Sequence, residues 1–303
     1  MSTDRPFLGV MLMLGFCVLA PLGDSVAKML GGAVALGVLI LVRFAIQAAM
    51  LIPLVLWKGA GLRLPPGLLG WTLLRTLLHI VGIGLMFSAL RFLPLADAIA
   101  IAFVMPFIML LLGHFLMGEQ VGIQRMAACA VGFIGTLLVI QPNFVEVGAP
   151  ALLPLGVAVV FALFMMVTRK VARGLDPIRL QAISGIQATL ILLPVVLLLP
   201  LPGTEIEVGM SLRTWGLMAL MGVNGTLAHL FMTWSLRFAP ASTLAPMQYL
   251  EIPIGTLIGW IIFRDLPNGL AALGICITIA AGLYVILRER RLARRTADVP
   301  AAA

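Results

Sequence analysis

The chain contains two similar stretches, Ser88-Ala89-Leu90-Arg91-Phe92-Leu93-Pro94 and Trp234-Ser235-Leu236-Arg237-Phe238-Ala239-Pro240, 146 positions apart. An apolar segment follows each stretch and ends in an acid, Glu119 in the first case and Asp265 in the second. A segment rich in glycine and alanine follows each acid. The same order of features at both places predicts an internal repeat.

The composition around these stretches is that of a membrane protein. Hydrophobic residues make up 62% of the chain and charged residues 11%, whereas a soluble domain has about 45–50% apolar and about 25% charged residues. The apolar excess runs from 7 to 287, so we expect no separate soluble domain. The net charge of +8 could suggest nucleic acid, but the basic residues lie in short connections and the tail, so we expect no nucleic-acid partner.

Ten segments are long and apolar enough to span a membrane, which takes about 20 residues. The predicted fold is therefore an all-α polytopic membrane protein with ten transmembrane helices. The N-terminal segment is expected to be a retained span rather than a cleaved signal peptide, because its removal would break the repeat. The predicted spans are 7–30, 35–57, 68–90, 95–117, 123–141, 150–169, 178–200, 214–236, 241–263 and 268–287.

Charge predicts the orientation of these spans. Most of the 20 Lys and Arg residues fall in connections on the side that holds the N-terminus, and such a bias marks the cytoplasmic side. Both termini are therefore expected in the cytoplasm, with the chain in a bacterial inner membrane. The tail 288–303 is expected to anchor this topology and to contact anionic lipid.

The repeat divides the chain into two halves, 7–141 and 150–287, of five spans each. Because five is odd, the second half must enter the membrane from the opposite side, which predicts an inverted-topology repeat. Such repeats suit alternating access, in which the two halves exchange conformations. The sequence thus favours a transporter, with a non-transporting membrane scaffold as the alternative.

Ionisable residues inside spans are candidates for function, because a charge near the bilayer centre costs about 2.5–3.5 kcal/mol or more. Glu251 is the sharpest candidate, since it lies near the middle of its span between two prolines, with Gln248 and Tyr249 beside it. Removal from water disfavours the charged form of a carboxyl group, so proton coupling through Glu251 is a hypothesis. The alternative is a structural salt bridge to Arg43 or Arg75.

Two arginines lie inside spans, each four residues from a polar partner. Arg43 shares a helix face with Gln47, and Arg75 shares one with His79. A guanidinium can bind a carboxylate or a phosphate of a substrate. The alternative is that both arginines tie helices together.

Three further residues complete the candidate set. Asp24 lies one turn from Lys28, so it is either a gate or substrate contact or one half of a local ion pair. Asp97 begins a span, as a helix-capping charge or as a proton or cation site. His229 lies deep in its span and is either part of the site or in a helix–helix hydrogen bond; for His114 we favour the hydrogen bond.

Enzymatic and cofactor chemistry find no support in the sequence. No Walker motif, H-E-x-x-H or G-x-S-x-G is present, so we expect neither ATP coupling nor an enzyme, with an intramembrane enzyme as the least favoured alternative. The scattered histidines predict no metal site, and Cys17, Cys129 and Cys276 are read as packing residues. Gly132 and Gly135, and Gly255 with Gly259, are expected at close helix contacts.

A set of short motifs runs through nearly the whole chain. It consists of Arg43-Phe44, Arg75, Ala89-Leu90-Arg91-Phe92-Leu93-Pro94-Leu95-Ala96-Asp97-Ala98, Pro106-Phe107, Gly118-Glu119, Gly132-Phe133-Ile134-Gly135, Leu236-Arg237-Phe238-Ala239-Pro240, Gln248-Tyr249-Leu250-Glu251 and Phe263-Arg264-Asp265. In this combination the chain resembles the EamA-type members of the drug/metabolite transporter superfamily. One departure is Arg264-Asp265, where a Gly-Glu pair is typical of the family.

The resemblance implies ten helices around a central cavity and a small-molecule substrate such as an amino acid, a vitamin, a nucleoside-like compound or a drug. Within that range a riboflavin-like or nucleoside-like solute is favoured, because Tyr249, Gln248 and Arg75 could stack on a ring and bind its polar edge. Import and export both remain open, and a homo-oligomer is compatible with the sequence.

Overall fold

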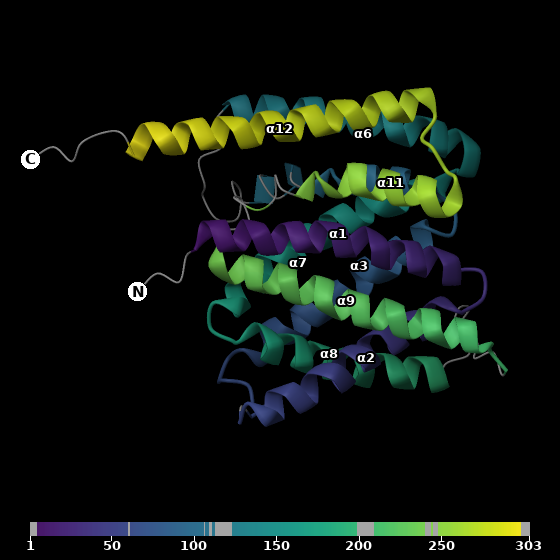
Figure 1. The fold of residues 1–303 in the computed structure, drawn as a ribbon, viewed down its shortest axis with the longest axis vertical. Coiled ribbons are helices and arrows are strands. Elements are labelled where there is room, and N and C mark those ends of the chain that lie inside the picture. The colour runs from purple at the N-terminus through teal and green to yellow at the C-terminus, as the bar shows by residue number, and fades with distance from the viewer. Residues whose placement is uncertain are drawn as a thin grey trace, which may run out of the picture.

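The computed structural model of the chain is a bundle of helices (Figure 1). It describes residues 5–59, 61–105, 107–108, 111–112, 123–198, 209–239, 244 and 248–297. The helices are α1 (Pro6–Leu30), α2 (Leu36–Trp57), α3 (Leu69–Ala89), α4 (Leu95–Ala102), α6 (Ile123–Val147), η1 (Ala149–Leu152), α7 (Leu153–Ala172), α8 (Pro177–Leu198), α9 (Leu212–Phe238), α11 (Glu251–Phe263) and α12 (Gly269–Ala297).

This architecture confirms the prediction of an all-α membrane protein. Within the described residues, seven helices are long and apolar enough to cross a membrane, and two shorter apolar helices, Glu251–Phe263 and Gly269–Ala281, accompany them. The expected span 95–117 is represented by α4 and by a turn at Phe103 and Val104. The count of ten spans and their inverted arrangement stay predictions.

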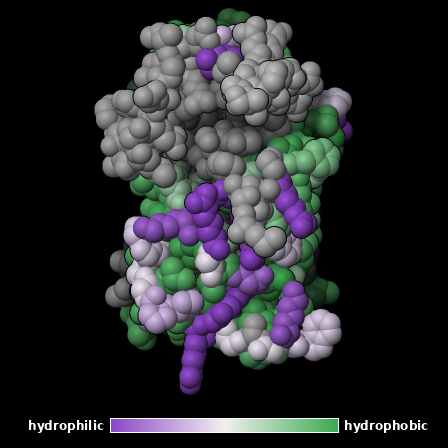
Figure 2. Space-filling view, turned by 90° about the vertical axis from the view of Figure 1, so that its left-hand side faces the viewer, coloured by the Kyte–Doolittle hydropathy of each residue, from purple (hydrophilic) through white to green (hydrophobic). Residues whose placement is uncertain are grey.

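The connections gather at two opposite ends of the bundle. α1 begins and α12 ends at the same end, on the left of Figure 1. The Arg5 amide donates to the Phe238 carbonyl at 2.9 Å, and Arg237 pairs with Asp176 at 3.6 Å. These contacts bring the start of α1, the end of α9 and the α7–α8 turn together. Figure 2 looks onto this end and shows hydrophilic residues gathered over it.

Every long helix of one half packs against a helix of the other half. Neighbouring helices approach most closely at glycines: a Cβ added to Gly135 of α6 would lie 2.8 Å from the Gly274 carbonyl of α12. One added to Gly185 of α8 would lie 2.9 Å from the Ala48 amide of α2. The most extensive contacts join α1 with α9, α6 with α12, α2 with α8 and α3 with α7; α2 also packs on α9, α1 on α11 and α4 on α11.

Candidate functional site

A cavity lies between the two halves of the chain. It spans about 690 Å³, a value that includes its open mouth. Its walls are mostly apolar and aromatic, with a few polar groups that come from α1, α9 and the start of α11. The lining residues are Phe16, Ala20, Asp24, Gly82, Ile83, Met86, Phe87, Ile99, Ala102, Phe103, Met105, Val157, Ala158, Phe161, His229, Gln248 and Glu251.

Glu251 supplies a carboxyl group to this cavity. It is the first residue of α11, so its position follows from where that helix begins. Its carboxyl group interacts with the Cys17 thiol of α1 and, through charge, with Asp24 on the same helix. A carboxyl in the wall of a mainly apolar cavity is a group that can bind a cation or exchange a proton.

Gln248 and Tyr249 occupy different places although they are neighbours in sequence. Gln248 is buried and lines the cavity, and its Oε1 has no hydrogen-bond partner within the described part of the chain. Tyr249 is also buried, but it packs on Phe103, with the ring centroids 5.4 Å apart. Phe103 lines the cavity, so Tyr249 supports the wall from behind.

Arg43 faces a second, smaller cavity next to the first. This cavity spans about 360 Å³, again with its opening included, and Asp24, Asn224 and His229 share its lining. The Asn224 amide is fixed because it donates to the Leu19 carbonyl at 2.8 Å. Asp24 and His229 line both cavities, so the two spaces adjoin.

The hydrogen-bond donors of the Arg43 guanidinium are only partly paired. Nη2 lies 3.5 Å from the Gly225 carbonyl, and the group lies over the Phe44 ring at 4.9 Å. Nη1 is buried and has no partner among the residues that the structure places. Gly225 leaves room for this arrangement, since a Cβ there would lie 2.9 Å from Arg43 Nε.

Arg75 lies outside both cavities. It is fully buried, and it donates from Nε to the Thr168 hydroxyl at 2.9 Å and from Nη1 to the Ser184 hydroxyl at 2.7 Å. Its guanidinium also lies 4.7 Å from the centroid of the Phe164 ring. These contacts tie α3 to α7 and α8, which fits the helix-tying alternative for this arginine.

The two described histidines meet across the bundle. The Nε2 atoms of His79 and His229 are 3.3 Å apart. His79 is stacked on Phe164 and meets the edge of Phe44, whereas His229 reaches the cavity. Neither Nδ1 has a hydrogen-bond partner in the described ranges.

Gln47 belongs to a polar chain that joins α2, α8 and α9. Its amide donates to the Gln181 carbonyl at 2.8 Å. The Gln181 side chain in turn donates to the His229 carbonyl and to the Thr233 hydroxyl, both at 2.8 Å. The sequence reasoning missed Gln181, together with Asn224, Thr168 and Ser184; a polar residue inside an apolar span was the available signal.

Asp97 is buried in the wall between α4 and α6 rather than in a cavity. One carboxyl oxygen accepts from the Asn143 amide at 2.8 Å. The other has no partner in the part of the chain that is described. The amide of Asn143 also donates to the Val139 carbonyl, so Asp97 is held by a residue that is itself fixed.

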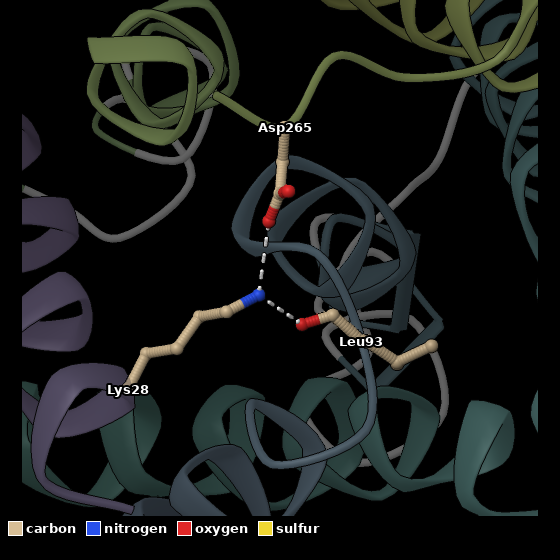
Figure 3. Close-up of polar contacts among 3 residues, drawn as sticks. All are labelled: Lys28, Leu93 and Asp265. Carbon is tan, nitrogen blue, oxygen red and sulfur yellow. Dashed lines mark hydrogen bonds and ion pairs between the residues drawn. The ribbon is translucent and has the colours of Figure 1, made fainter. Parts of the chain in front are cut away.

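Lys28 joins three segments at the end of the bundle opposite the start of α1 (Figure 3). Its ammonium group donates to the Leu93 carbonyl at 2.8 Å and pairs with Asp265 at 3.3 Å. The interaction expected between Lys28 and Asp24 within one helix is thus replaced by one across helices. Arg264 ends α11 in the left-handed conformation, at φ 59°, where glycine is usual.

No group of three metal-ligating side chains occurs among the described residues. Pro106, His114, Gly118 and Glu119 lie outside that part of the chain, as do Pro246, the proline that precedes Glu251, and the side chain of Cys129. The structure therefore offers Asp24, Arg43, His229, Gln248 and Glu251 as the groups that face cavities.

Comparison with known proteins gives the family. The model of the EamA-like transporter family matches residues 7–141 and 149–288. The riboflavin transporter of Vibrio cholerae is 27% identical over 260 residues, 86% of this chain and 85% of that protein. The S-adenosylmethionine uptake transporter of Rickettsia prowazekii is 24% identical over 283 residues, 93% of this chain and 94% of that protein.

A solved structure described only as "Crystal structure of protein" aligns with a TM-score of 0.65. It is 23% identical and the alignment covers 95% of this chain and 98% of that one, which supports the fold alone. The family match takes in both halves of the chain. This chain therefore belongs to the EamA-like transporter family of the drug/metabolite transporter superfamily, and it is a small-metabolite transporter rather than an enzyme.

Proposed function

We propose that this chain carries a small organic metabolite with a flat ring, vitamin-like, nucleoside-like or amino-acid-like, across the bacterial inner membrane by alternating access. The observation that carries the proposal is the lining of the first cavity. Phe16, Phe87, Phe103 and Phe161 offer ring faces from both halves of the chain, and apolar walls with few polar groups are typical of small-molecule sites.

The pairing of helices supports alternating access through inverted repeats. A two-fold axis that superimposes the two halves in chain order would make α1 equivalent to α7, α2 to α8, α3 to α9, α4 to α11 and α6 to α12. The α1–α9 pair would then be equivalent to the α3–α7 pair, and the α2–α8, α4–α11 and α6–α12 pairs would each lie on the axis. Four of these pairs are the most extensive contacts of the bundle and the fifth, α4–α11, is also present, a pattern that fits exchangeable halves. In the same proposal both termini face the cytoplasm, as the charge bias favours.

Glu251 is proposed as the coupling residue. Its carboxyl group lies in the wall of the cavity beside Asp24 and Cys17. Two carboxyl groups in one low-dielectric space disfavour each other's ionisation, so a proton or a cationic group bound there would be released or exchanged as the cavity changes its exposure.

The other candidates divide into substrate contacts and supports. Gln248 and His229 are proposed to bind polar edges of the ring, because both face the cavity with an unused polar atom. Arg75, His79 and Asp97 are proposed to hold the helices that form its walls. Tyr249 is proposed to position the Phe103 ring.

The test compares cells that express the wild type, Glu251→Gln or Asp97→Asn, each supplied with riboflavin and with S-adenosylmethionine. Asp97→Asn is the matched control, since it neutralises a buried carboxyl outside the cavity. Mass spectrometry of cells and medium is expected to show one compound redistributed by the wild type and by Asp97→Asn, but not by Glu251→Gln.

Two results would count against the proposal. If Glu251→Gln transports with the wild-type rate and pH dependence, the coupling role is withdrawn while transport stands. If folded, inserted wild type redistributes nothing from a panel of vitamins, nucleosides and amino acids, transport of such a metabolite is refuted.

A further inference from the structure

The second cavity presents a cationic side chain, Arg43, that the proposed function leaves unused, beside Asp24, which also lines the first cavity. Arg43 and Asp24 both line it. They interact through charge, yet no ion pair within 4.0 Å joins them in the described part of the chain. The guanidinium of Arg43 and the carboxyl group of Asp24 therefore do not form a direct ion pair.

Arg43 is held so that one edge of its guanidinium stays free. Its side chain is 3% exposed, and Nη1 has no partner there, although the group is backed by the Phe44 ring and fits against Gly225. A buried donor without an acceptor costs about 1–3 kcal/mol, and more when it is charged. A ligand that brings an acceptor would recover that free energy.

The two cavities adjoin, so one ligand can reach both. The residues that line both are Ala20, Asp24, Ile83, Phe87 and His229. The first cavity supplies ring faces, and the second supplies one charge of each sign. A ligand that occupied both would have a ring at one end and a charged group at the other.

We infer that the second cavity binds a zwitterionic end of the substrate, with its carboxylate on Arg43 and its ammonium group on Asp24. This rests on the proposed function and narrows the substrate to a heteroaromatic compound that carries an α-amino acid end. The guanidinium fork matches a carboxylate in two hydrogen bonds. A ligand with one charge would leave the opposite residue buried and unpaired, and that penalty provides the selectivity.

The experiment measures binding to the purified full-length protein in lipid nanodiscs. Four probes separate the ring from the charged end: S-adenosylmethionine; S-adenosylhomocysteine, which keeps the amino acid end without the sulfonium charge; 5′-methylthioadenosine, which lacks both; and riboflavin, which has a ring and no charged end. The variants are Arg43→Gln, Arg43→Lys and Asp24→Asn. Arg75→Lys is the control, because it alters an equally buried arginine that faces neither cavity.

Wild type is expected to bind S-adenosylmethionine more tightly than 5′-methylthioadenosine. Arg43→Gln should weaken S-adenosylmethionine binding by about tenfold to a hundredfold, as loss of a charged hydrogen-bond pair does, and should leave 5′-methylthioadenosine within about twofold. Arg43→Lys should keep part of the preference for S-adenosylmethionine over 5′-methylthioadenosine. Arg75→Lys should lower the stability of the protein without changing the ratio of its affinities for S-adenosylmethionine and 5′-methylthioadenosine. Where Arg43→Gln does not accumulate, Asp24→Asn tests the same preference from the ammonium side.

The inference is overturned if wild type binds S-adenosylhomocysteine and 5′-methylthioadenosine equally, or if Arg43→Gln weakens the binding of both by the same factor. It is also overturned if riboflavin binds best and is insensitive to Arg43, although the proposed transport of a ring compound then stands. Transport itself is judged separately by the cell assay with Glu251→Gln, so the two failures are distinguishable.

Discussion

Replacing Lys28 by methionine is expected to loosen the end of the bundle at which Lys28 joins α1 to the segments before α4 and after α11, and so to open the cavity from that end. The ammonium group contacts the Leu93 carbonyl before α4 and Asp265 after α11, and it lies one turn from Asp24 on α1. Each of these three helices forms part of the cavity wall. Methionine keeps the length and the apolar stem of lysine while removing all donors, so the change isolates the polar contacts.

The structure gives the size of the effect. A hydrogen bond from a charged donor to a carbonyl contributes about 1.5 kcal/mol at the lower end of its range. The pair with Asp265 adds about 0.5 kcal/mol, because Asp265 is 39% exposed and solvent screens the interaction. A total of about 2 kcal/mol corresponds to about a thirtyfold shift toward an open state.

Cys17 provides the assay. It is fully buried, contacts Glu251 and is not among the residues that line either cavity, so a membrane-impermeant thiol reagent reaches it only when the helices around the cavity separate. With Cys129 and Cys276 changed to serine, the rate of Cys17 labelling reports the open population. Lys28→Met should raise that rate by about tenfold to thirtyfold, from the side of the membrane on which the Lys28 end of the bundle lies.

Asp265→Asn is the matched control for this labelling experiment. It keeps the bond to Leu93, so it should raise labelling by less than about fivefold, and the double variant should not exceed Lys28→Met alone. An unchanged labelling rate in Lys28→Met, measured on protein that still melts cooperatively, would refute the reasoning and leave Lys28 as a surface contact.

Three further outcomes are expected. Arg75→Leu should lower the thermal midpoint of detergent-solubilised protein by more than Thr168→Ala does, because leucine leaves the two buried hydroxyls of Thr168 and Ser184 without their donor, at about 1–3 kcal/mol each; equal midpoints would contradict the role of Arg75 in joining these helices. Asn143→Ala should cost about 1–3 kcal/mol by leaving the Asp97 carboxyl without its donor, measured as the loss of folded protein on heating, and Asp97→Asn should rescue part of it. Gly135→Leu should prevent folded protein from accumulating, since its side chain would collide with α12; a normal monodisperse elution profile would show that the two helices can separate.

The helices themselves could be predicted from the sequence where an apolar run is long and uninterrupted. The expected span 35–57 and the observed α2 (Leu36–Trp57) differ by one residue, because about 20 apolar residues suffice to define a span. The expected span 123–141 is shorter than α6 (Ile123–Val147), since Pro142 and Asn143 read as a turn but continue the helix. Asn143 then reaches Asp97 from inside that helix.

The partners of the buried charges could not be predicted, because helical spacing reveals only which residues share a face. Arg75 and His79 do share one, and both contact the Phe164 ring. Their polar atoms nevertheless meet different partners, Arg75 the hydroxyls of Thr168 and Ser184 and His79 the ring of His229. Hydroxyl residues give a weak signal in a span, since many bind the carbonyl one turn earlier, as Thr226 does.

The partners now visible divide the polar residues into two groups with different energetic roles. Lys28 and Arg75 bind groups on other segments and so lower the free energy of one arrangement of the bundle, although Arg75 Nη2 is buried without a partner in the described part of the chain. Arg43 and Gln248 keep buried atoms without partners at the walls of the cavities, as far as the described residues show. Such atoms destabilise the empty state in an apolar surrounding. A transporter needs such unpaired atoms in its cavity. The free energy that a substrate gains by pairing with them can drive a rearrangement only because the empty cavity lacks that pairing.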